Sequence, residues 1–333
     1  MEETMVTTEP RERAGQVSWS VSRAKLFGEC RRAYYYKYFL ASGGWRADAP
    51  ELSRKAYALS KMSSLPLLVG ETVHAVIADA VRSEDEDLSE EAMVGRGREL
   101  FRRIVAASRA GRVPPLSEFY YGPAPSEARL AECSDLVASC LRSLWQLPLW
   151  RDVRALQPDD RLVLEEFATF HVGNAAAIVR PDLVFRKGGR IHLVDWKSGK
   201  PRASDRLQLA CYALFAQYRW HVRPEEIVVS AAYLRDGVVS PSFLSPAELS
   251  LARGVVESGY KQLAKAVPRG PLSQHPPDFP CTTDPWPCKW CNYGELCARG
   301  IDHSSACTPS SRRLRPHHCS SATLTIGAQS GPT

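Results

Sequence analysis

Apolar residues in the first half of the chain recur at helical spacing. Ser22 is expected to cap a helix that runs through Leu26, Cys30, Tyr34 and Tyr38. The same periodicity predicts three more helices, at 67–82, 88–110 and 126–146. The first half of the chain is therefore predicted to be a helical region.

Segments rich in β-branched residues follow in the second half, and three strands are predicted at 161–172, 176–185 and 191–195. The residues from Arg186 to Gly189 separate the last two and suit a hairpin turn. The pattern then predicts a helix at 204–219, a strand at 227–234 and a helix at 246–267. The first of these helices is expected to bury one face, formed by Leu207, Ala210, Cys211, Leu214, Phe215 and Tyr218. This order predicts an α/β core behind a helical N-terminal region.

The two ends of the chain, 1–16 and 302–333, lack apolar periodicity and are expected to be disordered. Folding is expected within one domain at 17–301. Its parts are a helical region at 17–150, an α/β core at 151–267 and a cysteine-bearing segment at 268–301.

Composition narrows the class of protein. The chain has 333 residues, 44% of them hydrophobic and 24% charged, which is ordinary for a globular protein. A net charge of +6 mildly favours an anionic partner. We find neither the apolar core of a signal peptide nor an apolar run that would cross a bilayer, so we expect a cytoplasmic protein without membrane contact. Ten cysteines in a reducing compartment are better explained as metal or cluster ligands than as disulfides.

Two carboxylates and an ammonium group are expected to meet near the predicted hairpin. Asp182 lies in one strand, and Asp195 and Lys197 are two residues apart, so strand alternation puts both of these side chains on one face. Oxygen ligands suit Mg²⁺, and hydrolysis of a phosphodiester needs activated water and positive charge beside the phosphate. In isolation, an Asp-x-Lys sequence is more often a turn or strand end with a solvated lysine than part of a catalytic site. Gln208 and Tyr212, one turn apart on the following helix, favour a shared site.

The sequence resembles the PD-(D/E)XK nuclease superfamily, in particular its RecB-like branch, which includes helicase-linked nuclease domains and CRISPR-associated single-strand exonucleases. The matching motifs span about 20–300, and they are Ser22 to Tyr36, Gly70 to His74, Pro181-Asp182, Asp195-Trp196-Lys197 and Gln208-x-x-x-Tyr212. The resemblance implies a restriction-endonuclease-like core, in which helices flank a central mixed sheet. It also implies a metal-dependent deoxyribonuclease.

By this resemblance the metal ligands are His74, Asp182 and Asp195, with the Trp196 carbonyl oxygen as a further candidate. An isolated histidine such as His74 is more often a core or surface residue, and only the family pattern assigns it to the metal. An imidazole ligand favours Mn²⁺ relative to an all-oxygen site, and Mg²⁺ is the other candidate.

The resemblance also assigns roles around the metal. Lys197 is expected to position or activate water and to stabilise the transition state, while Gln208 and Tyr212 orient Lys197 or the DNA backbone. Glu165 and Glu166 lie on the preceding predicted strand, where one of them is expected to support the metal ligands without binding the metal.

The C-terminal cysteines form a compact array in which Cys288, Cys291 and Cys297 follow a Cys-x2-Cys-x5-Cys spacing. Three thiolates at this spacing can face one centre, but the spacing does not distinguish Zn²⁺ from an iron-sulfur cluster. A zinc site would take Cys281 or His303 as its fourth ligand.

The resemblance implies a [4Fe-4S] cluster whose fourth ligand is Cys30, because Cys30 stands in the apolar-Cys-Arg context of the iron-sulfur members. Such a cluster would tie the two ends of the chain together in a structural role. Three other cysteines lie among apolar residues at helical spacing and are expected to be core thiols, namely Cys133, Cys140 and Cys211.

Basic and aromatic residues alternate from Arg31 to Tyr38, which suits contact with phosphates and stacking on the bases of a single strand. For Tyr34 and Tyr38 we instead expect packing of the first helix onto the core. Lys200 and Arg202 are better candidates for phosphate contacts. No base-reading module is recognised, so we do not expect sequence-specific cleavage.

These observations favour a DNA exonuclease that prefers single strands or ends and acts in DNA repair, recombination or defence against foreign DNA. The alternatives are a non-catalytic DNA-binding or assembly subunit and an iron-sulfur sensor that retains the fold. The sequence has no phosphate-binding loop of an ATPase, so a partner helicase, or a repair or CRISPR-type partner, would be a separate subunit.

Overall fold

The computed structural model describes residues 17–83, 85, 87–112 and 114–297. The predicted disordered ends at 1–16 and 302–333, and the candidate zinc ligand His303, lie outside the described residues.

A five-stranded mixed sheet forms the centre of the fold, in the order β1-β4-β5-β6-β7. The inner strands β5 and β6 are parallel, whereas the other neighbours are antiparallel. Helices flank this sheet, which confirms the expected fold class. The strands are β1 (Arg161–Leu164), β4 (Leu183–Lys187), β5 (Arg190–Lys197), β6 (Ile227–Tyr233) and β7 (Val238–Ser242).

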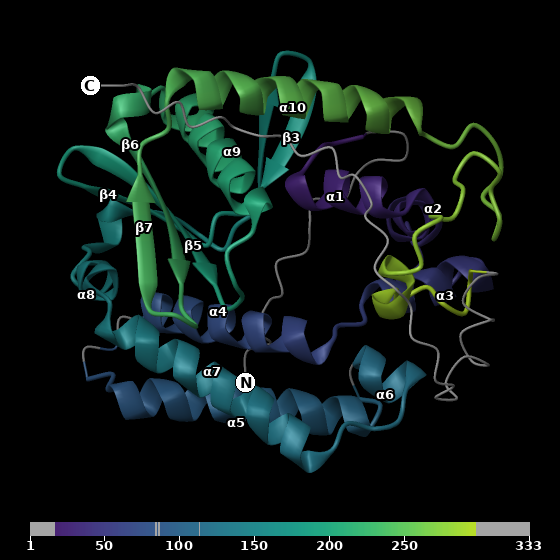
Figure 1. Cartoon of the computed structure of the whole chain (residues 1–333), viewed down its shortest axis with the longest axis horizontal. Coiled ribbons are helices and arrows are strands. Elements are labelled where there is room, and N and C mark those ends of the chain that lie inside the picture. The colour runs from purple at the N-terminus through teal and green to yellow at the C-terminus, as the bar shows by residue number, and fades with distance from the viewer. Residues whose placement is uncertain (1–16, 84, 86, 113, 298–333) are drawn as a thin grey trace, which may run out of the picture.

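The helices cover the two faces of the sheet (Figure 1). The strand β5 shows this division, because Leu193 packs into the core cluster shared with α9 and α10, whereas Val194 and Trp196 pack into the cluster shared with α4, α5 and α7. Asp195 and Lys197 alternate with these residues and therefore face the α9 side. The covering helices are α4 (Leu65–Ser83), α5 (Glu90–Arg109), α7 (Glu127–Gln146), α9 (Ala203–Trp220) and α10 (Pro246–Lys265).

The predicted hairpin between the two central antiparallel strands is confirmed. Gly188 and Gly189 both have positive φ, at 57° and 73°, a conformation that glycine adopts without steric cost. The turn fixes the β4–β5 register, in which Leu183 pairs with Val194. Asp182 and Asp195, the next residues along each strand, are therefore brought opposite each other.

Two of the predicted strands were wrong in extent. The segments 161–172 and 176–185 each contain two strands, and their inner parts form a separate hairpin of β2 (Ala168–Val172) and β3 (Ala175–Val179). The backbone leaves the extended conformation at Glu165, where φ is 54°. Apolar alternation continues across these breaks, which is why the pattern alone did not reveal them.

The first helix was predicted as one continuous element, but it is interrupted at Cys30. The capping residue of α1 (Val21–Glu29) is Ser20 rather than Ser22, since the Ser20 hydroxyl accepts from the N–H of Arg23 at 3.2 Å. Cys30 is extended and its sulfur accepts from the N–H of Ala33, which begins α2 (Arg31–Tyr35). A short π-helix, η1 (Tyr36–Leu40), follows directly.

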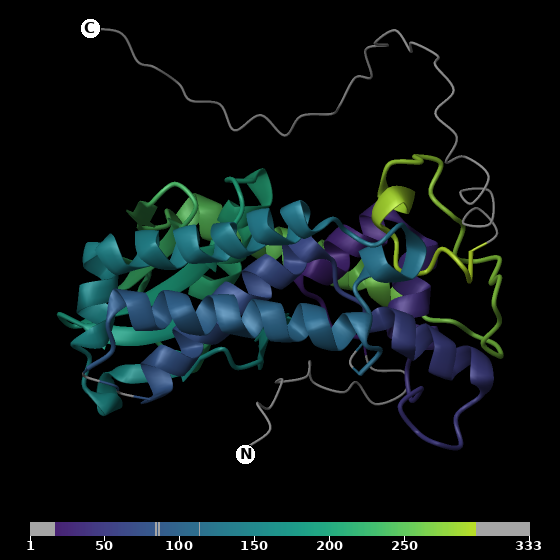
Figure 2. The ribbon, with the colours of Figure 1, turned by 90° about the horizontal axis from the view of Figure 1, so that it is seen from below.

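The aromatic and basic run from Arg31 to Tyr38 joins the two ends of the described chain. Arg32 donates to the carbonyl oxygens of Phe279 and Pro276, and the hydroxyl of Tyr35 donates to the carbonyl oxygen of Ser273. Figure 2 shows the C-terminal segment beside these N-terminal helices. Burial of Tyr34 confirms its predicted packing role, whereas the predicted contact with DNA is wrong for the equally buried Tyr35 and Tyr36.

The predicted buried face of α9 is largely confirmed, because five of its six residues pack into the core cluster on that side of the sheet. Tyr218 was wrongly included, since 46% of its surface is exposed near the end of the helix. The expected core thiols of Cys133, Cys140 and Cys211 are all buried.

Several short helices were not predicted. They are α3 (Glu51–Ser60), α6 (Ser117–Tyr121), α8 (Pro148–Arg154), η2 (Pro158–Asp160), η3 (Pro224–Glu226) and η4 (Pro287–Trp290).

None of the described helices has both the length and the apolar character needed to cross a membrane.

Trp19 packs against α10 at a position that only glycine fits. A Cβ atom at Gly259 would lie 2.2 Å from Nε1 of the buried Trp19. We predict that Gly259→Ala lowers the free energy of unfolding by about 1–3 kcal/mol through overpacking. Denaturant unfolding of the purified protein measures this.

The matched control is Gly254→Ala, five residues earlier on the same helix, where an added Cβ meets no atom within 4 Å. This variant is expected to be more stable than the parent by about 0.5–1 kcal/mol, because alanine is the better helix former. Equal stability of both variants would contradict the close packing of Trp19.

Candidate metal-dependent active site

Two buried aspartates meet at the ends of β4 and β5, where the sequence predicted them. Asp182 and Asp195 are 6% and 3% exposed. The backbone N–H of Trp196 donates to Asp182 Oδ2 at 2.6 Å, which fixes one of the two carboxylates against the neighbouring strand. Burial, followed by the charge of Asp182, raises the pKa of Asp195, so this pair requires nearby positive charge to remain ionised.

Lys197 supplies part of that charge from the same face of β5. Its Nζ lies 2.5 Å from Asp195 Oδ2 and donates to Gln208 Oε1 at 2.8 Å. Asp205 Oδ1 lies 3.7 Å away. The side-chain amide of Gln208 in α9 therefore fixes the position of the Lys197 ammonium. The contact between Asp195 and Lys197 confirms that strand alternation puts both side chains on one face.

Gln208 and Tyr212 face the site together from α9. The Gln208 amide donates to Asp195 Oδ1 at 3.0 Å and to the Tyr212 hydroxyl at 2.7 Å. The Tyr212 hydroxyl donates to the carbonyl oxygen of Arg180 at 2.9 Å and lies 3.2 Å from Asp195 Oδ1. The expected contact between Gln208 and Lys197 is present, while Tyr212 acts on Lys197 through Gln208 and Asp195.

His74 reaches the carboxylates from α4, on the other side of the sheet. Its Nε2 lies 2.8 Å from the Trp196 carbonyl oxygen, and its Nδ1 lies 3.2 Å from oxygens of both Asp182 and Glu165. Burial lowers the pKa of His74, but the Asp182 and Glu165 carboxylates outweigh burial and hold that pKa well above its usual range. Both ring nitrogens therefore face acceptors, as suits an imidazolium.

The glycine one turn before His74 lies close to the end of β5. A Cβ atom at Gly70 would lie 3.0 Å from Oγ of Ser198, the residue after Lys197. Alanine at this position would therefore require the Ser198 hydroxyl to shift slightly. The two segments pack closely beside the point where His74 Nε2 contacts the Trp196 carbonyl oxygen.

Glu165 is a third carboxylate of the site. It is 5% exposed, and its left-handed backbone turns the side chain towards His74. Arg180 holds it there, with Nη2 2.7 Å from Glu165 Oε2 and Nε donating to the Glu165 carbonyl oxygen. From the sequence, Glu165 was expected to have only a supporting role, and Glu166, which is exposed, was an equal candidate for it. The distinguishing signal, a positive φ in a non-glycine residue, cannot be read from residue types.

The donor set fits a divalent cation. Ligand atoms of His74, Glu165 and Asp182 all lie within 4.8 Å of one another. Asp195, which was also expected to be a ligand, lies outside this group and pairs with Lys197, whose Nζ is 2.5 Å from its buried Oδ2. One imidazole with several carboxylate oxygens suits Mn²⁺ or Mg²⁺, and such an ion would replace the imidazolium proton among these acceptors.

Three of the four cysteines expected to share a centre pack against one core cluster. Cys30 reaches it from the N-terminal helices, and Cys291 and Cys297 reach it from the C-terminal segment. Burial raises the pKa of Cys291 to about 12, with further increases from the nearby thiolates of Cys30, Cys297 and Cys288. A fifth thiol joins them, since Cys281 Sγ lies 3.4 Å from Cys297 Sγ. All five are free of disulfides.

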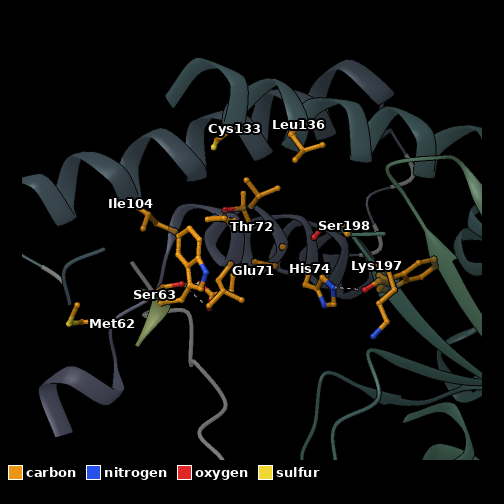
Figure 3. A pocket seen from close by; sticks show the side chains of 18 of the residues that line it. Met62, Ser63, Glu71, Thr72, His74, Ile104, Cys133, Leu136, Lys197 and Ser198 are labelled. Atoms are coloured by element: carbon orange, nitrogen blue, oxygen red, sulfur yellow. Dashed lines mark hydrogen bonds between the residues drawn. The ribbon is translucent and has the colours of Figure 1, made fainter. Parts of the chain in front are cut away.

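One cavity of about 2500 Å³ connects the candidate metal ligands with the cysteine-bearing segment. Lys197 and His74 line one part of it, while Met62 lines another and Cys133 and Leu136 of α7 lie across from α4 (Figure 3). Lys200 and Arg202, which were expected to contact phosphates, also line this cavity. The site is therefore open to an extended ligand.

Comparison with known proteins identifies a relationship over most of the chain. A profile of the PD-(D/E)XK nuclease superfamily matches residues 18–298, which include the whole constellation from Cys30 to Cys297. No curated protein matches the chain.

We predict that Glu165→Gln weakens Mn²⁺ binding by roughly tenfold or more, because a neutral amide replaces a charged ligand or its support. Isothermal titration calorimetry of the purified protein measures the affinity directly. Glu166→Gln is the matched control, since it makes the same chemical change at an exposed neighbour. Equal Mn²⁺ affinity of the two variants would remove Glu165 from the site.

Proposed function

The chain belongs to the PD-(D/E)XK nuclease superfamily, and we propose that it is a RecB-like, metal-dependent DNA exonuclease. The proposed substrate is a single strand or a DNA end. Its proposed setting is DNA repair, recombination or defence against foreign DNA, with any helicase or CRISPR-type partner as a separate subunit.

The observation that carries this proposal is the convergence of Asp182, Asp195 and Lys197 with His74. Four residues from two strands and a helix present charged groups to one cavity, and two of them are buried carboxylates. A subunit that only binds DNA has no need of buried acids next to the substrate, because carboxylates repel phosphates. The constellation therefore supports hydrolysis over simple binding.

Each residue has a separate proposed task. A divalent cation held by His74, Glu165 and Asp182, with Asp195 as an additional ligand, would supply a Lewis acid and lower the pKa of water. Lys197 places a positive charge where negative charge develops on the phosphate. Gln208 fixes the orientation of Lys197, because its Oε1 accepts a hydrogen bond from the Lys197 ammonium at 2.8 Å.

Two features support a single strand or an end as the substrate. Side chains from α4 and α7 line the cavity, and so do residues at the end of β5. A ligand at Lys197 is therefore surrounded on several sides. Lys200 and Arg202, just beyond Lys197, add positive charge for the neighbouring phosphates. A flexible single strand adapts to such an enclosed path more easily than a stiff duplex.

The cysteines are proposed to hold a [4Fe-4S] cluster through Cys30, Cys288, Cys291 and Cys297. The packing of Cys30, Cys291 and Cys297 against one core cluster supports a shared cationic centre, because thiolates that are partly removed from water are stable together only when a metal compensates their charge. Zinc is the competing occupant. Cys281 Sγ lies 3.4 Å from Cys297 Sγ, so among the described residues Cys281 is the candidate for the fourth ligand of a zinc site.

The nuclease proposal predicts that the purified protein degrades linear single-stranded DNA with Mn²⁺ or Mg²⁺. Lys197→Ala is expected to lower kcat by roughly 100- to 1000-fold, because it removes one charge from the transition state. The measurement is steady-state cleavage of a labelled oligonucleotide. A circular single strand of the same sequence tests the need for an end and is expected to resist.

The matched control is Lys187→Ala, which removes a lysine from the end of β4, where it forms a surface ion pair with Asp152. Its activity should equal that of the parent protein. Absence of cleavage by the parent, or equal rates for parent and Lys197→Ala, would contradict the enzyme proposal. Rapid cleavage of the circle would contradict exonuclease action.

The cluster proposal predicts a brown, anaerobically purified protein with about four irons per chain. Cys291→Ser is expected to lose the colour and the iron, whereas the control Cys281→Ser retains both. Iron analysis and visible absorption measure this. A colourless protein with about one zinc per chain, lost in Cys281→Ser, would instead support the zinc site.

A further inference from the structure

Two tryptophans project from the cysteine-bearing segment and are among the most exposed apolar side chains of the described protein. Trp286 is 61% exposed and Trp290 is 69% exposed. Exposed tryptophan is unusual, because burial of its large apolar surface is favourable. A pair of them on one short segment is therefore a candidate contact surface.

Both tryptophans line the same cavity as Lys197 and His74. The segment that carries both tryptophans is anchored to the wall of this cavity at Met62. The side-chain amide of Asn292 donates to the carbonyl oxygen of Met62 at 2.8 Å. Figure 3 shows Met62 on the far side of Glu71 and His74 from Lys197. A strand that passes Lys197 and His74 and continues along this wall therefore reaches the tryptophans.

The local backbone keeps the two indoles on one turn. Trp286 immediately precedes η4 and its N–H donates to Asp284 Oδ1 at 2.9 Å, while Trp290 ends the same helix. Cys288 and Cys291 lie on this turn, and the hydroxyl of Tyr121 donates to the carbonyl oxygen of the following Asn292. The tryptophans thus stand on a braced segment rather than on a free loop.

Positive charge accompanies the aromatic rings. Lys289 Nζ lies 4.7 Å from the centre of the Trp286 ring. Lys61, next to Met62, and Lys37 of η1 line the cavity wall, where Glu29 is an acidic neighbour. Aromatic faces interleaved with ammonium groups match a single nucleic-acid strand, whose bases stack while its phosphates pair with cations.

We infer that Trp286 and Trp290 stack on unpaired bases of the DNA strand whose scissile phosphate lies at Lys197. This inference rests on the proposed nuclease function and adds the surface that holds the strand away from the reacting bond. It gives a physical reason for a preference for single strands, because the bases of a duplex already stack on each other. It also assigns the aromatic contact to two exposed tryptophans in place of Tyr35 and Tyr36, which are buried.

The test is fluorescence anisotropy of a labelled oligothymidylate titrated with the full chain in EDTA, where no cleavage occurs. Trp286→Ala and Trp290→Ala are each expected to weaken binding by roughly 5- to 150-fold, the usual loss for one stacked base. Trp45→Ala is the matched control, because Trp45 is 44% exposed but lies outside the cavity lining. Its affinity should equal that of the parent.

A second pair of variants separates stacking from apolar contact and from misfolding. Trp290→Phe keeps an aromatic face and is expected to retain most of the affinity, whereas Trp290→Leu, which is also apolar, is expected to lose it. A thermal midpoint near that of the parent confirms that each variant folds. Parent-like affinity in all the cavity variants, as would follow if the tryptophans contacted another protein, overturns the inference.

The outcome is distinguishable from failure of the proposed function. A parent protein that binds single strands through Trp286 and Trp290 but cleaves nothing would refute the nuclease and leave the stacking surface standing. Cleavage and binding that are indifferent to both substitutions would refute the stacking surface alone. A blunt duplex of the same length is expected to bind weakly and equally to the parent and the tryptophan variants.

Discussion

The burial of Asp182 beside Asp195 is the constraint on which the site depends. Two carboxylates out of water repel each other and lose hydration, so the surrounding elements must supply donors and positive charge. They do so from three directions, with Lys197 on the same strand, Gln208 from α9 and His74 from α4. The His74 imidazolium and the Lys197 ammonium lie where a metal cation would otherwise balance the carboxylates. Their positive charges explain how the buried carboxylates remain stable in the folded protein without a metal.

Close approach of distant segments makes this compensation geometrically feasible. At Gly70, α4 lies so close to Ser198, just after β5, that an added Cβ atom would be 3.0 Å from the Ser198 hydroxyl. The left-handed backbone of Glu165 turns a third carboxylate inward, where Arg180 neutralises it. Strain of this kind costs free energy and persists only where the surroundings fix it, which is consistent with its position beside the proposed metal ligands.

The join between the chain ends serves the same cavity from its other side. Arg32 and Tyr35 are used to anchor the segment around 273–279, although their sequence pattern suited contact with nucleic acid. Because Arg32 and Tyr35 are engaged in these internal hydrogen bonds, they are not available to a ligand. The exposed aromatic side chains are instead Trp286 and Trp290, on the segment that Arg32 and Tyr35 anchor. The same fold thus brings the cysteines together and presents the tryptophans to the cavity.

The amino-acid sequence alone was enough to predict the central hairpin and its charged residues, because a glycine turn and strand alternation are local properties that place Asp182, Asp195 and Lys197 together. Apolar periodicity also located most of the long helices. Other features became visible only in the folded chain: 161–172 divides into two strands, Glu165 rather than Glu166 faces His74, and Tyr36 is buried. These outcomes depend on backbone conformation at single residues and on contacts between segments far apart in the chain, which no local pattern of apolar and polar residues encodes.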